Sequence, residues 1–97
     1  MKAIFVAYNQ AFNEEIIELL EDLGQRGFTE WREIGGRGSE TGEPHRGSHA
    51  WPTQNHAVLS VVPDELAPKV MEALREKDAA YPDLGLRAWV LPVEDAL

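Results

Sequence analysis

Residues 35–52, GGRGSETGEPHRGSHAWP, separate two parts of the chain that share one order of predicted elements. This stretch holds five of the chain's eight glycines, two of its three histidines and two of its six prolines. A connection of this length is uncommon inside a small compact domain, where it is usually functional or disordered. A tryptophan and a pair of histidines are atypical of disordered segments, so we interpret residues 35–52 as a functional loop.

The part before the loop predicts a strand, a helix and a second strand. Residues 2–8, KAIFVAY, are apolar at almost every position, which is typical of a strand covered on both faces. A helix is expected to begin at Asn13 as its N-cap and to end at Gly24 as its C-terminal cap. Residues 27–34, GFTEWREI, alternate as a half-exposed strand does. The buried stripe of the helix is expected to contain Phe12, Ile16, Leu19, Leu20 and Leu23.

The part after the loop repeats this order. Residues 54–62, QNHAVLSVV, have apolar residues at both odd and even positions, which predicts a central strand with both faces covered. Asp64 is expected to cap a second helix, with Pro68 in its first turn. Residues 78–85 predict a turn, and residues 86–91, LRAWVL, the last strand. The buried stripe of this helix is expected to contain Leu66, Val70, Ala73 and Leu74.

The resulting order, βαββαβ, predicts a single α+β domain over residues 1–97 with a ferredoxin-like fold. Right-handed crossovers would then give a four-stranded antiparallel sheet with both helices on one face. The first and third strands are nevertheless apolar on both faces, so the other face of the sheet also needs a cover. The sheet of a neighbouring subunit is the simplest one.

Composition narrows the classes of function. The 97 residues include 17 acidic and 9 basic side chains, a net charge of -8 that argues against nucleic acid or an anionic membrane as partner. Cysteine is absent, which excludes disulfides, a thiol nucleophile and thiolate metal ligands. The first apolar run is too short to be a signal peptide or to span a bilayer, so we expect a cytoplasmic protein without membrane insertion. Since no constellation of side chains specifies catalysis, we do not expect an enzyme.

Three short patches carry a resemblance to a known family: residues 33–38, EIGGRG, residues 61–64, VVPD, and residues 90–94, VLPVE. In their order and spacing the chain resembles the PII-like signalling proteins, the group around the nitrogen regulatory protein P-II. The resemblance implies a homotrimer that binds a small effector in the cleft between subunits. It also implies that residues 35–52 form the loop that contacts a target protein and changes conformation when ligand binds.

Five loop residues are therefore candidates for effector binding or loop function: Gly35, Arg37, Gly38, Arg46 and Trp51. The two arginines could hold a carboxylate, bicarbonate or phosphate against glycine N–H groups. Alternatively, they pair with acidic residues of the same loop. The tryptophan is interpreted as an anchor against a neighbouring subunit rather than as a ligand platform.

The chain also departs from the family pattern. The resemblance implies a phosphate-binding loop with glycine and lysine between the second helix and the last strand, but residues 79–85, AAYPDLG, contain no lysine. The C-terminal arginine pair of the family and the loop tyrosine that is nucleotidylated are absent as well. These departures make ATP, ADP and AMP doubtful as ligands.

An alternative function rests on three histidines, His45, His49 and His56. Neutral imidazoles are common ligands of zinc, copper, nickel and cobalt. Two histidines do not make a site, so other ligands would come from acidic loop residues or another subunit. The alternative is a divalent metal-binding protein similar to the CutA proteins, which share this fold and are linked to metal tolerance. Otherwise these are surface histidines, because Gly47 disfavours the helix that would align the first two.

Overall fold

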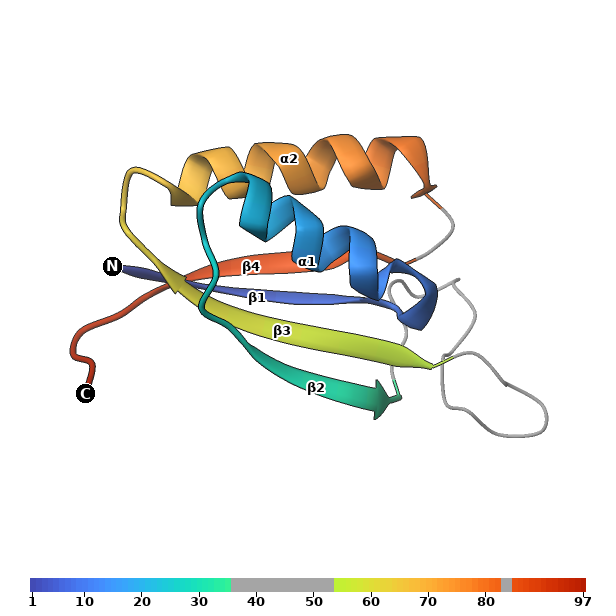
Figure 1. Ribbon diagram of the computed structural model, residues 1–97, viewed down its shortest axis with the longest axis horizontal. Helices are drawn as coiled ribbons and strands as arrows, with labels where there is room; N and C mark the ends of the chain where they lie inside the picture. The colour runs from blue at the N-terminus through green and yellow to red at the C-terminus, as the bar shows by residue number, and fades with distance from the viewer. Residues whose placement is uncertain (36–53, 83–84) are drawn as a thin grey trace.

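A computed structural model describes residues 1–35, 54–82 and 85–97 of the chain. Its strands and helices follow the order predicted from the sequence (Figure 1). The element bounds are β1 Lys2–Asn9, the 3-10 helix η1 Gln10–Phe12, α1 Asn13–Asp22, β2 Thr29–Ile34, β3 Asn55–Val62, α2 Ala67–Ala80 and β4 Arg87–Pro92. Among the described residues, neither helix is long and apolar enough to cross a membrane.

The four strands form one antiparallel sheet in the order β2-β3-β1-β4. Both helices lie on the same side of it (Figure 1). The predicted ferredoxin-like fold is thereby confirmed. β1 and β3 occupy the centre of the sheet, which explains why these two strands are the most buried of the four.

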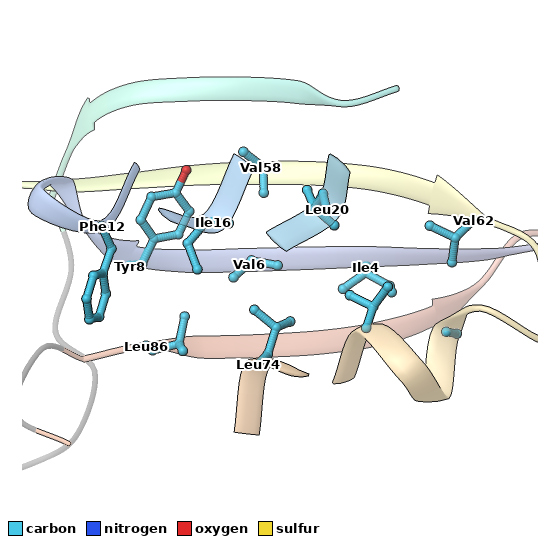
Figure 2. Packing of buried hydrophobic residues seen from close by; sticks show 12 residues of the cluster. Ile4, Val6, Tyr8, Phe12, Ile16, Leu20, Val58, Val62, Leu74 and Leu86 are labelled. Carbon is cyan, nitrogen blue, oxygen red and sulfur yellow. The ribbon is translucent and has the colours of Figure 1, made fainter. Parts of the chain in front are cut away.

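The hydrophobic core lies between the helices and one face of the sheet, which we call the covered face. Ile4, Val6 and Tyr8 of β1 point to this side and are at most 1% exposed (Figure 2). They pack with α1 through Ile16 and Leu20, and with residues of β3, α2 and the segment before β4. At about 25 cal/mol per Å² of apolar surface buried, this cluster supplies the main stabilisation of the chain.

The C-terminus of α1 agrees with the prediction, but its N-terminus does not. Gly24 has a φ of 85°, and its N–H donates to Glu21 while that of Gln25 donates to Leu20, the paired bonds of a Schellman cap. Asn13 is already inside the helix, and its Oδ1 accepts a 2.7 Å hydrogen bond from the buried Tyr8 hydroxyl. The chain instead enters through η1, which Asn9 caps by accepting from the N–H of Ala11.

Two expectations for α2 are corrected as well. The helix begins with Pro68 in its first turn, as predicted, but Asp64 does not cap it. The Asp64 carboxylate lies 2.8 Å from the amino group of Met1. The hydrogen bond from this amino group and its positive charge hold the pKa of the Asp64 carboxyl below its usual value. At its other end the helix continues to Ala80, beyond the predicted start of the turn at residue 78.

Candidate functional site

The face of the sheet opposite the helices, which we call the open face, is apolar but has no cover within the described part of the chain. Side chains alternate between the two faces along each strand, and residues paired across antiparallel strands share a face. Phe5 is paired with both Leu59 and Trp89, so all three lie on the open face. The other paired positions of this face are Ala3, Ala7, Thr29, Trp31, Ala57, Val61, Arg87 and Leu91.

Three aromatic rings cross the middle of the open face. The ring of Phe5 lies 5.8 Å from that of Trp31 and 6.0 Å from that of Trp89, centroid to centroid, with tilted planes. The two tryptophans remain 42% and 51% exposed, and Leu91 is also 51% exposed. An exposed apolar surface with aromatic residues at its centre is typical of a protein interface rather than of a wet sheet face.

Several polar groups lie at one end of the sheet, where β1 ends and β3 begins. Both flanks of residues 36–53 lie at this end, which we call the loop end, whereas both chain termini lie at the opposite end (Figure 1). Asn9 and Asn55 are paired here and buried. The N–H of Gln10 donates to the carbonyl of Gln54 at 2.9 Å, which fixes the point where the chain re-enters the sheet.

Tyr8 is the buried ionisable group of the loop end. Its side chain is fully buried, and burial raises the pKa of the phenol to about 12, with Glu30 adding to the rise and Arg32 opposing it. The Arg32 guanidinium lies 3.0 Å from the Glu30 carboxylate. Tyr8 is therefore held as a neutral hydrogen-bond donor to Asn13.

His56 is paired with Tyr8 on the covered face, and the two rings meet edge to face at 6.4 Å. Its Nδ1 atom is buried and has no hydrogen-bond partner among the described residues. A buried polar atom without a hydrogen-bond partner costs free energy. Of the three histidines predicted as metal ligands, His56 is the one that the structure describes.

Arg87 brings a positive charge to the loop end of the open face. It opens β4, is paired with Ala7, and lies two residues from Trp89 on the same face. One Nη1 hydrogen bond goes to the neighbouring Leu86 carbonyl at 2.7 Å, but no acidic group of the described chain pairs with its guanidinium. Sequence reasoning missed this residue, although its even spacing from Trp89 and Leu91 would have placed it on the open face.

The backbone at the end of β2 is unusual. Glu33 has a φ of 57°, the left-handed region that residues with a Cβ rarely adopt, at an irregularity in the pairing of β2 with β3. Its carbonyl accepts a 3.5 Å hydrogen bond from the side chain of Gln54, which directly precedes β3. This local bend sets the direction in which the chain leaves the sheet at Gly35.

Most of the residues predicted from the sequence as site residues lie outside the described parts of the chain. Gly35 is described and exposed, directly after β2. The others that fall outside are Arg37, Gly38, His45, Arg46, His49 and Trp51. Within the described residues, no group of three or more histidine, cysteine or acidic side chains is arranged to hold a metal ion.

Comparison with solved structures shows proteins of the same fold. The chain matches a PII-like signalling protein from Thermus thermophilus with a TM-score of 0.67 and 24% identity, over 92% of this chain and 82% of that one. It also matches CPII, a nitrogen regulatory PII-like protein from Thiomonas intermedia bound to ADP, AMP and bicarbonate. That match has a TM-score of 0.78 and 19% identity, over 98% of this chain and 93% of that one. At these identities the likeness establishes the shared fold. No curated protein sequence matches the chain significantly.

These structures correct the ligand expected from the sequence. The missing phosphate-loop lysine and C-terminal arginine pair make adenine nucleotides doubtful from the sequence alone, with no certain cofactor and a divalent metal (zinc, copper, cobalt or nickel) as a possible ligand. The Thiomonas protein of this fold is bound to ADP, AMP and bicarbonate, and another structure of it holds ADP and bicarbonate. The physical reason is that backbone N–H groups and arginines at other positions of a fold can also hold phosphate, so the absence of the family's lysine and arginine pair does not exclude nucleotide binding.

The family itself is established by sequence. The model of the family described as nitrogen regulatory protein P-II matches residues 1–97. The order of elements, the four-stranded sheet and the long segment between β2 and β3 agree with that match. The chain therefore belongs to the nitrogen regulatory protein P-II family.

Proposed function

We propose that this protein is a cytoplasmic PII-like regulator, a single domain that assembles as a homotrimer and binds an adenine nucleotide, with or without bicarbonate, between its subunits. Residues 35–52 then contact a target protein in a manner that depends on the bound ligand. The family is one of signalling regulators, which supports a regulatory rather than an enzymatic role. The observation that carries the proposal is an open apolar face with, at its loop end, a guanidinium that pairs with no described acidic group.

Assembly follows from the open face. Trp31, Trp89 and Leu91 are each at least 42% exposed in the single chain, and burying them against another subunit removes this apolar surface from water. Aromatic side chains at the centre of a contact commonly supply most of its binding free energy. The loop end then lies at the margin of the interface, where a cleft between subunits would form.

The residues at the loop end suit an anionic ligand. Arg87 can donate charge-assisted hydrogen bonds to a phosphate or to bicarbonate. Gly85, two residues earlier, has a φ of 68° and has no Cβ, so a ligand can approach its backbone closely. Arg37 and Arg46 of the loop are further candidates for the same anion, with Gly35 and Gly38 giving the loop freedom to rearrange.

Calorimetric titration with ADP, AMP and bicarbonate tests this function. We expect wild-type protein to bind ADP, and Arg87→Ala to weaken binding by roughly 10-fold or more, because a charge-assisted hydrogen bond contributes about 1.5–3 kcal/mol. The matched control is Arg26→Ala, which removes an exposed arginine before β2, away from the loop end. No heat of binding with any of the three ligands, or equal losses in both variants, would refute the proposal.

A further inference from the structure

The outer surface of the helices contains a groove that the proposed nucleotide site does not involve. It lies between α1 and α2 and encloses about 560 Å³. Leu19, Leu23 and Ala73 line it as partly buried apolar residues. A second hollow of about 400 Å³ shares Leu23 and Ala73 and extends along α2 to Pro68. The two hollows make one groove along the helix layer, lined by both apolar and charged residues.

The length of this groove suits a helical segment. α2 lines it from Pro68 to Ala80, and the 14 residues of this helix span about 21 Å at 1.5 Å per residue. A helix that binds in such a groove presents apolar residues at three- and four-residue spacing. Tyr81 at one end of the groove is 48% exposed and can pack against such a segment.

The margins of the groove are acidic. Glu15, Glu18 and Asp22 of α1 line one side, and Glu76 of α2 the other. All four are exposed, and none forms an ion pair with another described residue. The basic residues along the two hollows are Lys69 and Lys77.

This arrangement is unfavourable for α1 by itself. The helix contains acidic residues but no lysine or arginine, so its carboxylates have no partner one turn away. Glu18 and Asp22 are four residues apart, where like charges repel. Asp22 also lies in the last turn, at the negative end of the helix dipole. Cations supplied from outside the chain would relieve this repulsion.

We propose that this groove binds a basic amphipathic helix of another protein. The apolar stripe of that helix would cover Leu19, Leu23 and Ala73, while its lysines and arginines meet Glu18 and Asp22. A second copy of this chain does not fit, because its α1 has no basic residue, its α2 has as many acidic as basic residues, and the chain has a net charge of -8. Assembly through the open face leaves the groove accessible, so the protein has a second docking surface in addition to residues 35–52.

The test uses a fluorescent peptide of about 14 residues with leucines at helical spacing and lysines at the other positions. Binding to the purified protein is followed by fluorescence anisotropy at physiological ionic strength. A peptide of the same composition, with the leucines spread around the helix, reports on the apolar contact. We expect the amphipathic peptide to bind at least about 10-fold more tightly than the scrambled one.

Two double variants with the same change of charge isolate the groove. Glu18→Lys with Asp22→Lys reverses its margin, whereas Glu14→Lys with Glu21→Lys reverses two exposed acids of the same helix outside it. We expect the first pair to weaken binding at least about 10-fold and the second to change it by less than about twofold. If the first pair does not fold, Glu15→Lys with Glu18→Lys provides the same comparison.

Three results would overturn the proposal. One is no binding of the amphipathic peptide to the wild-type protein. Another is an equal loss of binding in both charge variants, which would indicate attraction to net charge alone. The third is equally tight binding of the scrambled peptide, which would exclude an apolar contact. ADP titrations of the two charge variants separate this proposal from the one for the nucleotide site. The nucleotide proposal predicts that both variants bind ADP with the affinity of the wild-type protein.

Discussion

The two faces of the sheet are built from the same strands but differ in what covers them. On the covered face, Ile4 and Tyr8 are fully buried by the chain's own helices. On the open face, Trp89 and Leu91 of β4 remain 51% exposed. The helices of one chain therefore cover only one face, and we propose that the apolar residues of the other face form a contact between chains.

The faces also differ in how their polar groups are satisfied. Ser60 is almost fully buried on the covered face, and its hydroxyl donates a 2.6 Å hydrogen bond to the carbonyl of Gly27. Arg87 on the open face has no acidic partner among the described residues. Ser60 is thus satisfied within the single chain, although His56 Nδ1 on the same face has no partner among the described residues. For Arg87 we propose that a ligand or a second subunit supplies the partner.

The largest effect is expected from a cavity in the covered face. Leu20→Ala removes a side chain that is 1% exposed, and we expect the free energy of unfolding to fall by about 3 kcal/mol. Chemical denaturation at several protein concentrations measures this loss, which should be similar at each. Leu91→Ala on the open face is the control, with an expected loss below about 1 kcal/mol when the protein is dilute. Equal losses at low concentration would contradict the distinction between the faces.

The next effect concerns assembly through the open face. Trp89→Ala removes a ring that contacts Phe5 and is half exposed, so we expect little change in circular dichroism but a loss of about 2 kcal/mol in association. Sedimentation velocity over a range of concentrations measures the shift toward single chains. Tyr81→Ala removes an equally exposed aromatic ring near the helices and should leave assembly unchanged. An oligomer that survives Trp89→Ala but not Tyr81→Ala would place the interface elsewhere.

A pH effect is expected from Tyr8. Its pKa is raised from 10.0 to about 12 in the folded chain, because burial disfavours the phenolate. The resulting stabilisation is complete below about pH 10 and is lost as the pH rises through about 12, a change of up to about 2–3 kcal/mol. The measurement is the difference in unfolding free energy between wild type and Tyr8→Phe at several alkaline pH values. A difference that does not vary with pH would contradict a buried neutral phenol.

The smallest effect is expected at the end of β2. Glu33→Gly places a residue without a Cβ at a φ of 57°, and we expect a gain of about 0.5–1 kcal/mol in the free energy of unfolding. Arg32→Gly, one residue earlier at an ordinary backbone angle, should instead lower stability because glycine weakens a strand. Thermal unfolding of both variants measures the two signs. A loss in both would show that the Glu33 conformation carries no strain.

Much of the fold could be predicted from the sequence, because apolar periodicity reports directly on which faces are buried. The continuous apolar run of β1 indicated a central strand, and the structure places it between β3 and β4. Gly24 was identified as a helix end because a left-handed residue favours glycine. The sequence also predicts that the second face of the sheet is apolar. Residues at odd and at even positions of a strand lie on opposite faces, and one layer of helices can cover only one of them.

The helix N-termini could not be predicted in the same way, because capping depends on tertiary contacts. Asn13 has a suitable side chain for a cap, but its Oδ1 instead accepts the hydrogen bond of the buried Tyr8 hydroxyl. Asp64 likewise pairs with the amino group of Met1, which is distant in sequence. Each competing partner becomes visible only when the sheet brings the two segments together.

The candidate site was predicted least completely. Arg87 was missed because its importance comes from its place on the open face beside Trp89, not from a sequence motif. Adenine nucleotides are doubtful from the missing residues alone, whereas the nucleotide site that we propose between subunits would depend on groups from more than one element. The roles of Arg37, Arg46, Trp51 and the loop histidines stay predictions, as does the cytoplasmic location.

The most direct test of the link between the open face and ligand binding is native mass spectrometry of wild type and Trp89→Ala, each with and without ADP. We predict that wild type is a trimer that takes up ADP, and that Trp89→Ala yields single chains that take up none. A wild-type protein that remains a single chain, or a Trp89→Ala single chain that binds ADP as well as wild type, would contradict a nucleotide site built between subunits on the open face.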